Sequence, residues 1–105
     1  MAENFAMEKD ISIINFITRL KTSINFNRVE IVDYWEADLC AIGLRDGDKL
    51  IYISTYNYLY DKEVKFDFDK ELLNNDHLDE IKIVETGRNV SEEDLIHEIK
   101  LFLGV

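Results

Sequence analysis

The chain has 105 residues, 47% of them hydrophobic, which suffices for one core but is too short for two ordinary domains. Lys and Arg total 12 against 22 Asp and Glu, so the formal net charge is −10. This balance excludes a generic nucleic-acid-binding protein and disfavours an anionic membrane surface, because both require positive charge. We expect a single domain over residues 1–105 that attracts basic partners.

Cysteine usage and hydropathy indicate the cytoplasm as the default location. Cys40 is the only cysteine, so no intramolecular disulfide can form, and its apolar surroundings predict a buried structural thiol. No apolar run is long enough to cross a membrane. The N-terminus also lacks the basic region and apolar block of a secretory signal.

Residues 8–25 are predicted to form an amphipathic helix. Isoleucines recur at steps of three and four residues from Ile11 to Ile24, and polar residues occupy the opposite face. The β-branched content of this segment is high. Packing rather than intrinsic propensity must therefore stabilise the helix.

Three strands are predicted next, over residues 28–35, 39–45 and 49–56. Their apolar and β-branched residues are typical of strands, and the second and third flank the sequence Asp46-Gly47. Asp-Gly between two apolar runs is typical of a tight hairpin with positive φ at both central residues. The second and third strands should therefore pair antiparallel.

Two further strands are expected before the end of the chain. Residues 64–69 alternate apolar and charged side chains, which predicts a half-buried strand, and residues 80–86 predict another. Leu72 and Leu73 between them suggest a short turn of helix, followed by an exposed turn around His77.

The last helix is predicted from its two ends. Ser91 is a suitable N-cap, Val90 and Leu95 have the spacing of a hydrophobic staple, and Gly104 is a suitable terminator. The element order predicts an α+β fold: a largely antiparallel four- or five-stranded sheet with the N- and C-terminal helices packed on one face. In the alternative arrangement, the two terminal helices cover opposite faces.

Motifs of catalysis or cofactor binding are missing from the sequence. The only histidines are His77 and His97, and no cysteine partner accompanies His97, Glu93 and Asp94, so we expect no metal and no cofactor. Carboxylates spaced two apart on a strand could act as acid and base, but a solvated sheet face explains them better. We therefore expect a protein that is not an enzyme.

Aromatic and acidic residues gather in two segments, residues 33–38 and 52–61. The first holds the only tryptophan among three acids, and the second holds four of the five tyrosines. Tyr and Trp dominate binding hot spots, while acids steer and pair with basic partners. The predicted partner-binding residues are Asp33, Tyr34, Trp35, Glu36, Asp38, Tyr52, Tyr56, Tyr58, Asp61, Asp67 and Asp69.

Residues 33–44, reading DYWEADLCAIGL, and residues 52–56, reading YISTY, resemble immunity proteins of contact-dependent growth-inhibition and related polymorphic toxin systems. The resemblance covers roughly residues 28–69 and includes no diagnostic motif. It implies a bacterial, non-catalytic protein that binds and neutralises a cognate toxin domain, often a nuclease. A nuclease must be basic where it holds phosphate, so an acidic inhibitor could cover that surface.

Two other readings remain open at this stage. The chain could be a regulatory interaction module, for example a homodimer formed through the tyrosine-rich strand. It could also be a small enzyme that uses its carboxylates, which would require a pocket with a displaced pKa.

Overall fold

The computed structural model describes residues 8–73 and 81–105. In chain order the elements are α1 (Ile11–Leu20), β1 (Glu30–Val32), β2 (Ala41–Asp46), β3 (Lys49–Ser54), the 3-10 turn η1 (Tyr56–Tyr58), β4 (Phe66–Leu73), β5 (Ile81–Val90) and α2 (Glu92–Leu103). The strands form one antiparallel sheet in the order β1-β2-β3-β4-β5. Each strand thus pairs with its neighbour in sequence, as short connections require.

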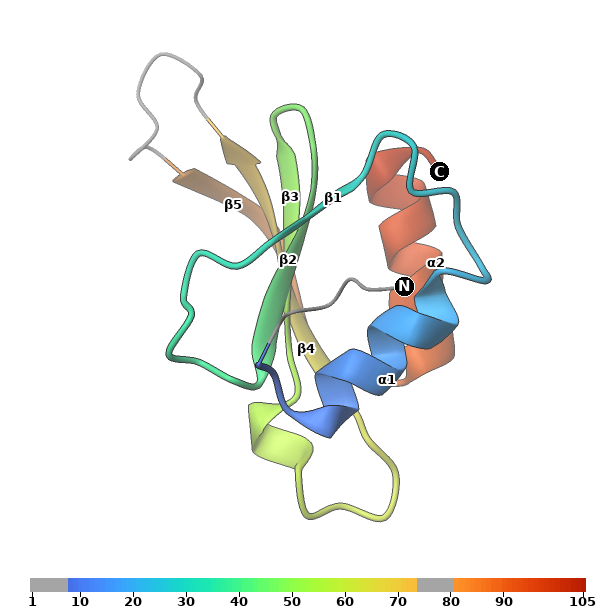
Figure 1. The fold of residues 1–105 in the computed structure, drawn as a ribbon. Helices are drawn as coiled ribbons and strands as arrows, with labels where there is room; N and C mark the ends of the chain where they lie inside the picture. The colour runs from blue at the N-terminus through green and yellow to red at the C-terminus, as the bar shows by residue number, and fades with distance from the viewer. Residues whose placement is uncertain (1–7, 74–80) are drawn as a thin grey trace.

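Both helices cover the same face of the sheet (Figure 1). A single apolar cluster joins the buried stripes of the two helices to alternate residues of the central strands, such as Ile51 and Ile53 of β3. The predicted α+β class and the placement of both helices on one face are confirmed. The alternative with helices on opposite faces is wrong.

The first helix is shorter than the predicted span of residues 8–25. Asp10 caps its N-terminus, because the carboxylate accepts the backbone N–H of Ser12 at 2.9 Å. The helix ends at Leu20, and the Thr22 hydroxyl donates to the Arg19 carbonyl at 2.7 Å in the turns that follow. Ile24 lies beyond the end of the helix but is still buried in the core. Its spacing from the earlier isoleucines therefore reflected burial rather than helical structure.

The last helix begins and ends as predicted. The Ser91 hydroxyl accepts the backbone N–H of Asp94 at 3.1 Å. At the other end Gly104 adopts φ 70°, and its N–H donates to the Lys100 carbonyl at 2.9 Å. Three acidic residues in the first turn also complement the helix dipole.

Replacing Ser91 with alanine should lower the free energy of unfolding by about 1 kcal/mol, because it removes this N-cap. Urea denaturation followed by circular dichroism measures the change. Ser23→Ala is the matched control, since Ser23 is exposed beyond the end of α1. Equal midpoints for Ser91→Ala and the wild type would contradict the capping role.

The hairpin between β2 and β3 forms one residue later than the sequence suggested. Asp46 pairs with Lys49, so the two central residues are Gly47 and Asp48. Gly47 has φ 64°, whereas Asp48 is not among the non-glycine residues with positive φ. A type I′ turn needs positive φ at both positions, so the turn matches type II′.

Strand boundaries account for the remaining differences. The expected strand 28–35 is reduced to β1, and residues 55 and 56 lie outside β3. Leu72 and Leu73 do not form a helical turn; they belong to β4, where Leu72 pairs with Lys49. Val64 lies outside this strand and is exposed.

β5 is also longer than predicted, since it continues to Val90 past two irregularities in its pairing with β4. The predicted turn around His77 and the first residue of the expected strand 80–86 lie outside the described residues. In residues 8–73 and 81–105, no helix has the length and apolar character of a membrane span.

Candidate functional site

Many of the predicted binding residues lie on or beside the helix-free face of the sheet. Ile51 and Ile53 of β3 point into the helix-covered core, so Tyr52 and Ser54 between and after them point to the other face. The register places Tyr52 opposite Asp69 of β4. In Figure 1 the connection from β1 to β2 runs along this side, away from the helices. We call this surface the open face.

Three aromatic rings form an edge-to-face series on the open face. The Trp35 ring centroid lies 5.0 Å from that of Tyr52 at 84°, and 6.1 Å from that of Tyr34 at 79°. Gly43 of β2 leaves room for this series, because a Cβ there would lie 3.2 Å from Cδ2 of Tyr52 and 2.8 Å from Cγ2 of Val32. Trp35 is 51% exposed and Tyr34 45%, so a partner could cover both rings.

A buried cation from the N-terminal segment holds the loop that carries Trp35. Lys9 Nζ lies 2.7 Å from Asp33 Oδ1 and donates to the Asp38 carbonyl oxygen at 2.7 Å. It also lies 3.5 Å from the Trp35 carbonyl oxygen, and its side chain is only 1% exposed. Lys9 therefore fixes the loop on both sides of Trp35.

The Asp67 carboxylate is already occupied by donors of the protein itself. It accepts the Tyr58 hydroxyl at 2.5 Å, the Asn57 Nδ2 at 2.9 Å and the Asn89 backbone N–H at 3.1 Å. Burial disfavours the charged form, but these hydrogen bonds outweigh burial and lower the pKa of Asp67. The carboxylate thus anchors η1 to the sheet. Asp67 can still attract a basic partner through its negative charge, but its oxygens are already engaged by donors of the protein.

Asp69 and Glu71 continue the acidic row along β4. Arg88 of β5 lies 3.3 Å from Asp69 Oδ1, and the two residues border a hollow of about 150 Å³ that Tyr52 also lines. Glu71 is 7% exposed. Burial, and secondly the charge of Asp69, raise the pKa of Glu71.

Tyr52 lies at the centre of these groups. Burial raises the pKa of its hydroxyl to about 12, and Asp33 and Asp38 add to the rise. The hydroxyl oxygen is buried without a hydrogen bond of normal geometry. A polar contact with the Trp35 backbone lowers the Tyr52 pKa and offsets part of the increase that burial causes. Tyr52 remains a neutral phenol at physiological pH and serves as a platform for Trp35.

The structure brings part of the predicted set together and leaves part of it apart. On the open face and its loop lie Asp33, Tyr34, Trp35, Asp38, Tyr52, Asp67 and Asp69. Glu36 is exposed in the same loop, and Asp61 is exposed beyond η1. Tyr56 was expected to share a strand face with Tyr52, but it lies in η1 and is 67% exposed. The predicted position of Tyr56 on the strand was wrong because β3 ends at Ser54, whereas its predicted role in partner binding stays a prediction.

Four residues that contribute to the open face escaped the sequence analysis. Glu71 continues the alternation of Asp67 and Asp69, so a longer predicted strand would have included it. No local pattern marks Lys9, Asn57 or Arg88, because each acts on residues distant in the chain.

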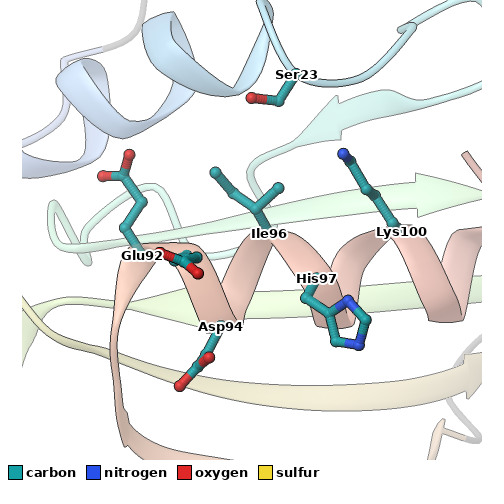
Figure 2. A pocket seen from close by; sticks show the side chains of 7 residues that line it. Ser23, Glu92, Asp94, Ile96, His97 and Lys100 are labelled. Atoms are coloured by element: carbon teal, nitrogen blue, oxygen red, sulfur yellow. The ribbon is translucent and has the colours of Figure 1, made fainter.

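A second hollow, of about 690 Å³, lies between the end of α1 and the outer side of α2. Figure 2 shows that Glu92 and Ile96 point toward Ser23, whereas Asp94 and His97 point away from it. Arg19 already binds Glu92 with a bidentate pair of hydrogen bonds at 2.8 and 2.7 Å. The side chains around this hollow therefore do not converge on a common point.

Cys40 is buried, as predicted, and burial foremost raises the pKa of its thiol. Within the part of the chain that the structure describes, no three His, Cys, Asp or Glu side chains are grouped as metal ligands. Comparisons with protein-family models, with curated proteins and with solved structures found no match to this chain.

Proposed function

We propose that this protein is a bacterial, cytoplasmic immunity protein. It binds a cationic toxin domain, with a nuclease as the expected class, through the open face and thereby neutralises the toxin. It carries out no catalysis in this role. The proposal extends the resemblance of residues 28–69 to immunity proteins of polymorphic toxin systems.

One observation carries the proposal: the exposed ring of Trp35 rests on Tyr52 with carboxylates on several sides. Asp33 and Asp38 belong to the same loop, and Asp69 faces Tyr52 across the strand pair. Lys9 pairs with Asp33 and Arg88 with Asp69, so these acids are partly neutralised within the fold. Aromatic anchors flanked by acidic residues are suited to interfaces that need both affinity and steering. A standard interface buries about 800 Å² on each partner, a size that a sheet face with its loop can supply.

The charge of the chain supports a basic partner. With a net charge of −10, the long-range field accelerates encounter with a cationic domain and repels competing nucleic acid. A nuclease presents its positive surface at the phosphate-binding site. An inhibitor of this kind would therefore compete with nucleic acid for the same surface.

The test uses the basic C-terminal domain of a large exported protein, which we expect to be encoded beside this chain. Trp35→Ala should accelerate dissociation of the complex by about 30-fold or more, because it removes the central anchor. Glu36→Lys should slow association several-fold at low salt and weaken its salt dependence. Stopped-flow fluorescence and surface plasmon resonance measure the two rates.

Glu93→Lys is the matched control for charge, since Glu93 is exposed on α2, on the helix-covered side of the sheet. Its rates should stay close to those of the wild type. If Trp35→Ala and Glu36→Lys behave like Glu93→Lys, the open face is not the toxin-binding surface.

A second candidate function is a homodimeric interaction module. β3 has a neighbour on each side, so a dimer cannot form by strand pairing at the tyrosine-rich strand. β5 is an edge strand of the sheet, and Ile83 and Val84 on it are 55% and 43% exposed. Light scattering distinguishes the two functions: a stable dimer that Val84→Lys dissociates would favour the module.

A further inference from the structure

Glu71 is the most deeply buried carboxylate in the acidic row of the open face. It is 7% exposed, against 9% for Asp67. Asp67 accepts hydrogen bonds from three donors. No hydrogen bond or ion pair joins Glu71 to any residue that the structure describes. The two neighbouring acids therefore differ: Asp67 is hydrogen-bonded within the fold, whereas the Glu71 oxygens make no such bond with the described residues and still reach solvent at the surface of a largely buried residue.

A buried carboxylate without a partner costs folding free energy when it is charged. Such groups are rare in proteins unless a ligand or a partner completes them, and they concentrate at functional sites. Glu71 lies at one of the two irregularities in the pairing of β4 with β5, and no hydrogen bond among the described residues requires a carboxylate there. A hydrophobic residue would fit the same site at lower cost.

The Tyr52 hydroxyl is a polar group next to Glu71 that, unlike the Glu71 oxygens, is shielded from solvent. Glu71 pairs with Leu50, two residues before Tyr52 on β3, so the two side chains are diagonal neighbours on the open face. They are close enough for the charge of Glu71 to act on Tyr52. The Tyr52 oxygen is buried without a hydrogen bond of normal geometry.

Apolar residues flank these two polar groups. Leu50 is fully buried on one side of Glu71. On the other side Ile83 of β5 pairs with Glu71 and is 55% exposed. Trp35 lies on the Tyr52 ring. A polar centre inside an apolar rim is the arrangement of an interface hot spot, where the rim excludes water from a central charged contact.

We propose that Glu71 receives the guanidinium group of one arginine of the partner, beside the shielded Tyr52 hydroxyl. The Glu71 carboxylate would accept its N–H groups, Asp69 would add negative charge, and the Trp35 ring would offer a face for stacking. Arginine fits better than lysine because a guanidinium group is weakly hydrated, planar and suited to aromatic faces. This inference rests on the proposed function and names the chemistry at its centre.

The free protein provides the first test through Glu71→Gln. The folded-state pKa of Glu71 is raised above its unfolded value, so folding disfavours the charged form. The cost is absent below the unfolded pKa, grows as the pH rises toward the folded pKa, and is complete above it. The urea midpoint of Glu71→Gln should therefore exceed that of the wild type at neutral pH, with the difference disappearing in acid.

The second test measures binding of an oligoarginine peptide at low salt, with Trp35 fluorescence as the signal. Glu71→Gln should weaken binding by about tenfold or more, since a hydrogen bond to a charged group is lost. Glu93→Gln removes the same charge from the helix side and should change affinity by less than about twofold. Tyr52→Phe keeps the ring and removes only a hydroxyl that is shielded from solvent, so it should change affinity by less than about twofold.

The outcomes separate this inference from the proposed function. Peptide binding that alters Trp35 fluorescence equally in the wild type and in Glu71→Gln overturns the arginine site but leaves the open face as the interface. Wild-type protein whose Trp35 signal does not respond to the peptide overturns both. A Glu71→Gln variant that is less stable than the wild type at neutral pH shows a structural role for Glu71 and overturns the inference.

Discussion

Replacing Lys9 with methionine should lower the free energy of unfolding by about 2–4 kcal/mol, because Asp33 and two loop carbonyls lose their buried cation. Asp33 keeps some access to water, at 26% exposure of its side chain, so the loss should stay below the limit for a fully buried pair. Urea denaturation gives the change in free energy.

The same variant should also release the loop that carries Trp35. Trp35 is the only tryptophan, so its near-ultraviolet circular dichroism and its emission wavelength report on this loop alone. We expect a weaker near-ultraviolet signal and red-shifted emission. Lys62→Met is the control, since Lys62 is exposed. A Lys9→Met variant with the wild-type midpoint and the wild-type Trp35 spectrum would show that the loop is ordered without Lys9.

Replacing Phe66 with alanine should lower the free energy of unfolding by about 3–5 kcal/mol, the usual effect of truncating a fully buried ring. Phe66 is 0% exposed. Its ring centroid lies 4.9 Å from that of Phe16, so this contact joins β4 to α1. Denaturation in urea or guanidinium chloride measures the loss.

A double-mutant cycle with Phe16→Ala tests whether the two rings act together. Because both truncations open the same part of the core, their combined effect should be smaller than the sum of the single effects. Val64→Ala is the surface control, with an expected change within about 0.5 kcal/mol. Strictly additive losses for Phe16 and Phe66 would mean that their contact does not couple helix and sheet.

Local sequence patterns predicted the elements of this fold where each pattern had a single physical cause. Ser91 and Gly104 have the chemistry of helix ends, and both caps form. The alternation over residues 64–69 was also informative, but both of its predicted ends were wrong: the strand begins at Phe66 and continues to Leu73. Two adjacent leucines fit either a helix or a strand, and pairing with Lys49 of β3 decides between them.

The candidate site was predictable only in part. Trp35 and Tyr52 were selected as aromatic residues near acids, and the structure places their rings together. Asp67 was selected for its charge, but its hydrogen bonds to Tyr58 and Asn57 fix it within the fold. Whether a carboxylate is available to a partner depends on whether donors from another segment of the chain, such as Asn57 and Tyr58, hydrogen-bond to it in the folded protein.

The sequence by itself determined the strong negative charge, the α+β element order, the caps of the last helix and the alternation that gives the sheet one apolar and one polar face. These follow from composition and from contacts within a few residues. Only the tertiary structure decided that the Lys9 ammonium holds the Trp35 loop and that Glu71 is largely buried with no hydrogen bond to the residues that the structure describes. Both facts depend on chain segments that are far apart in sequence, and burial and pairing are properties of the assembled sheet rather than of any single segment.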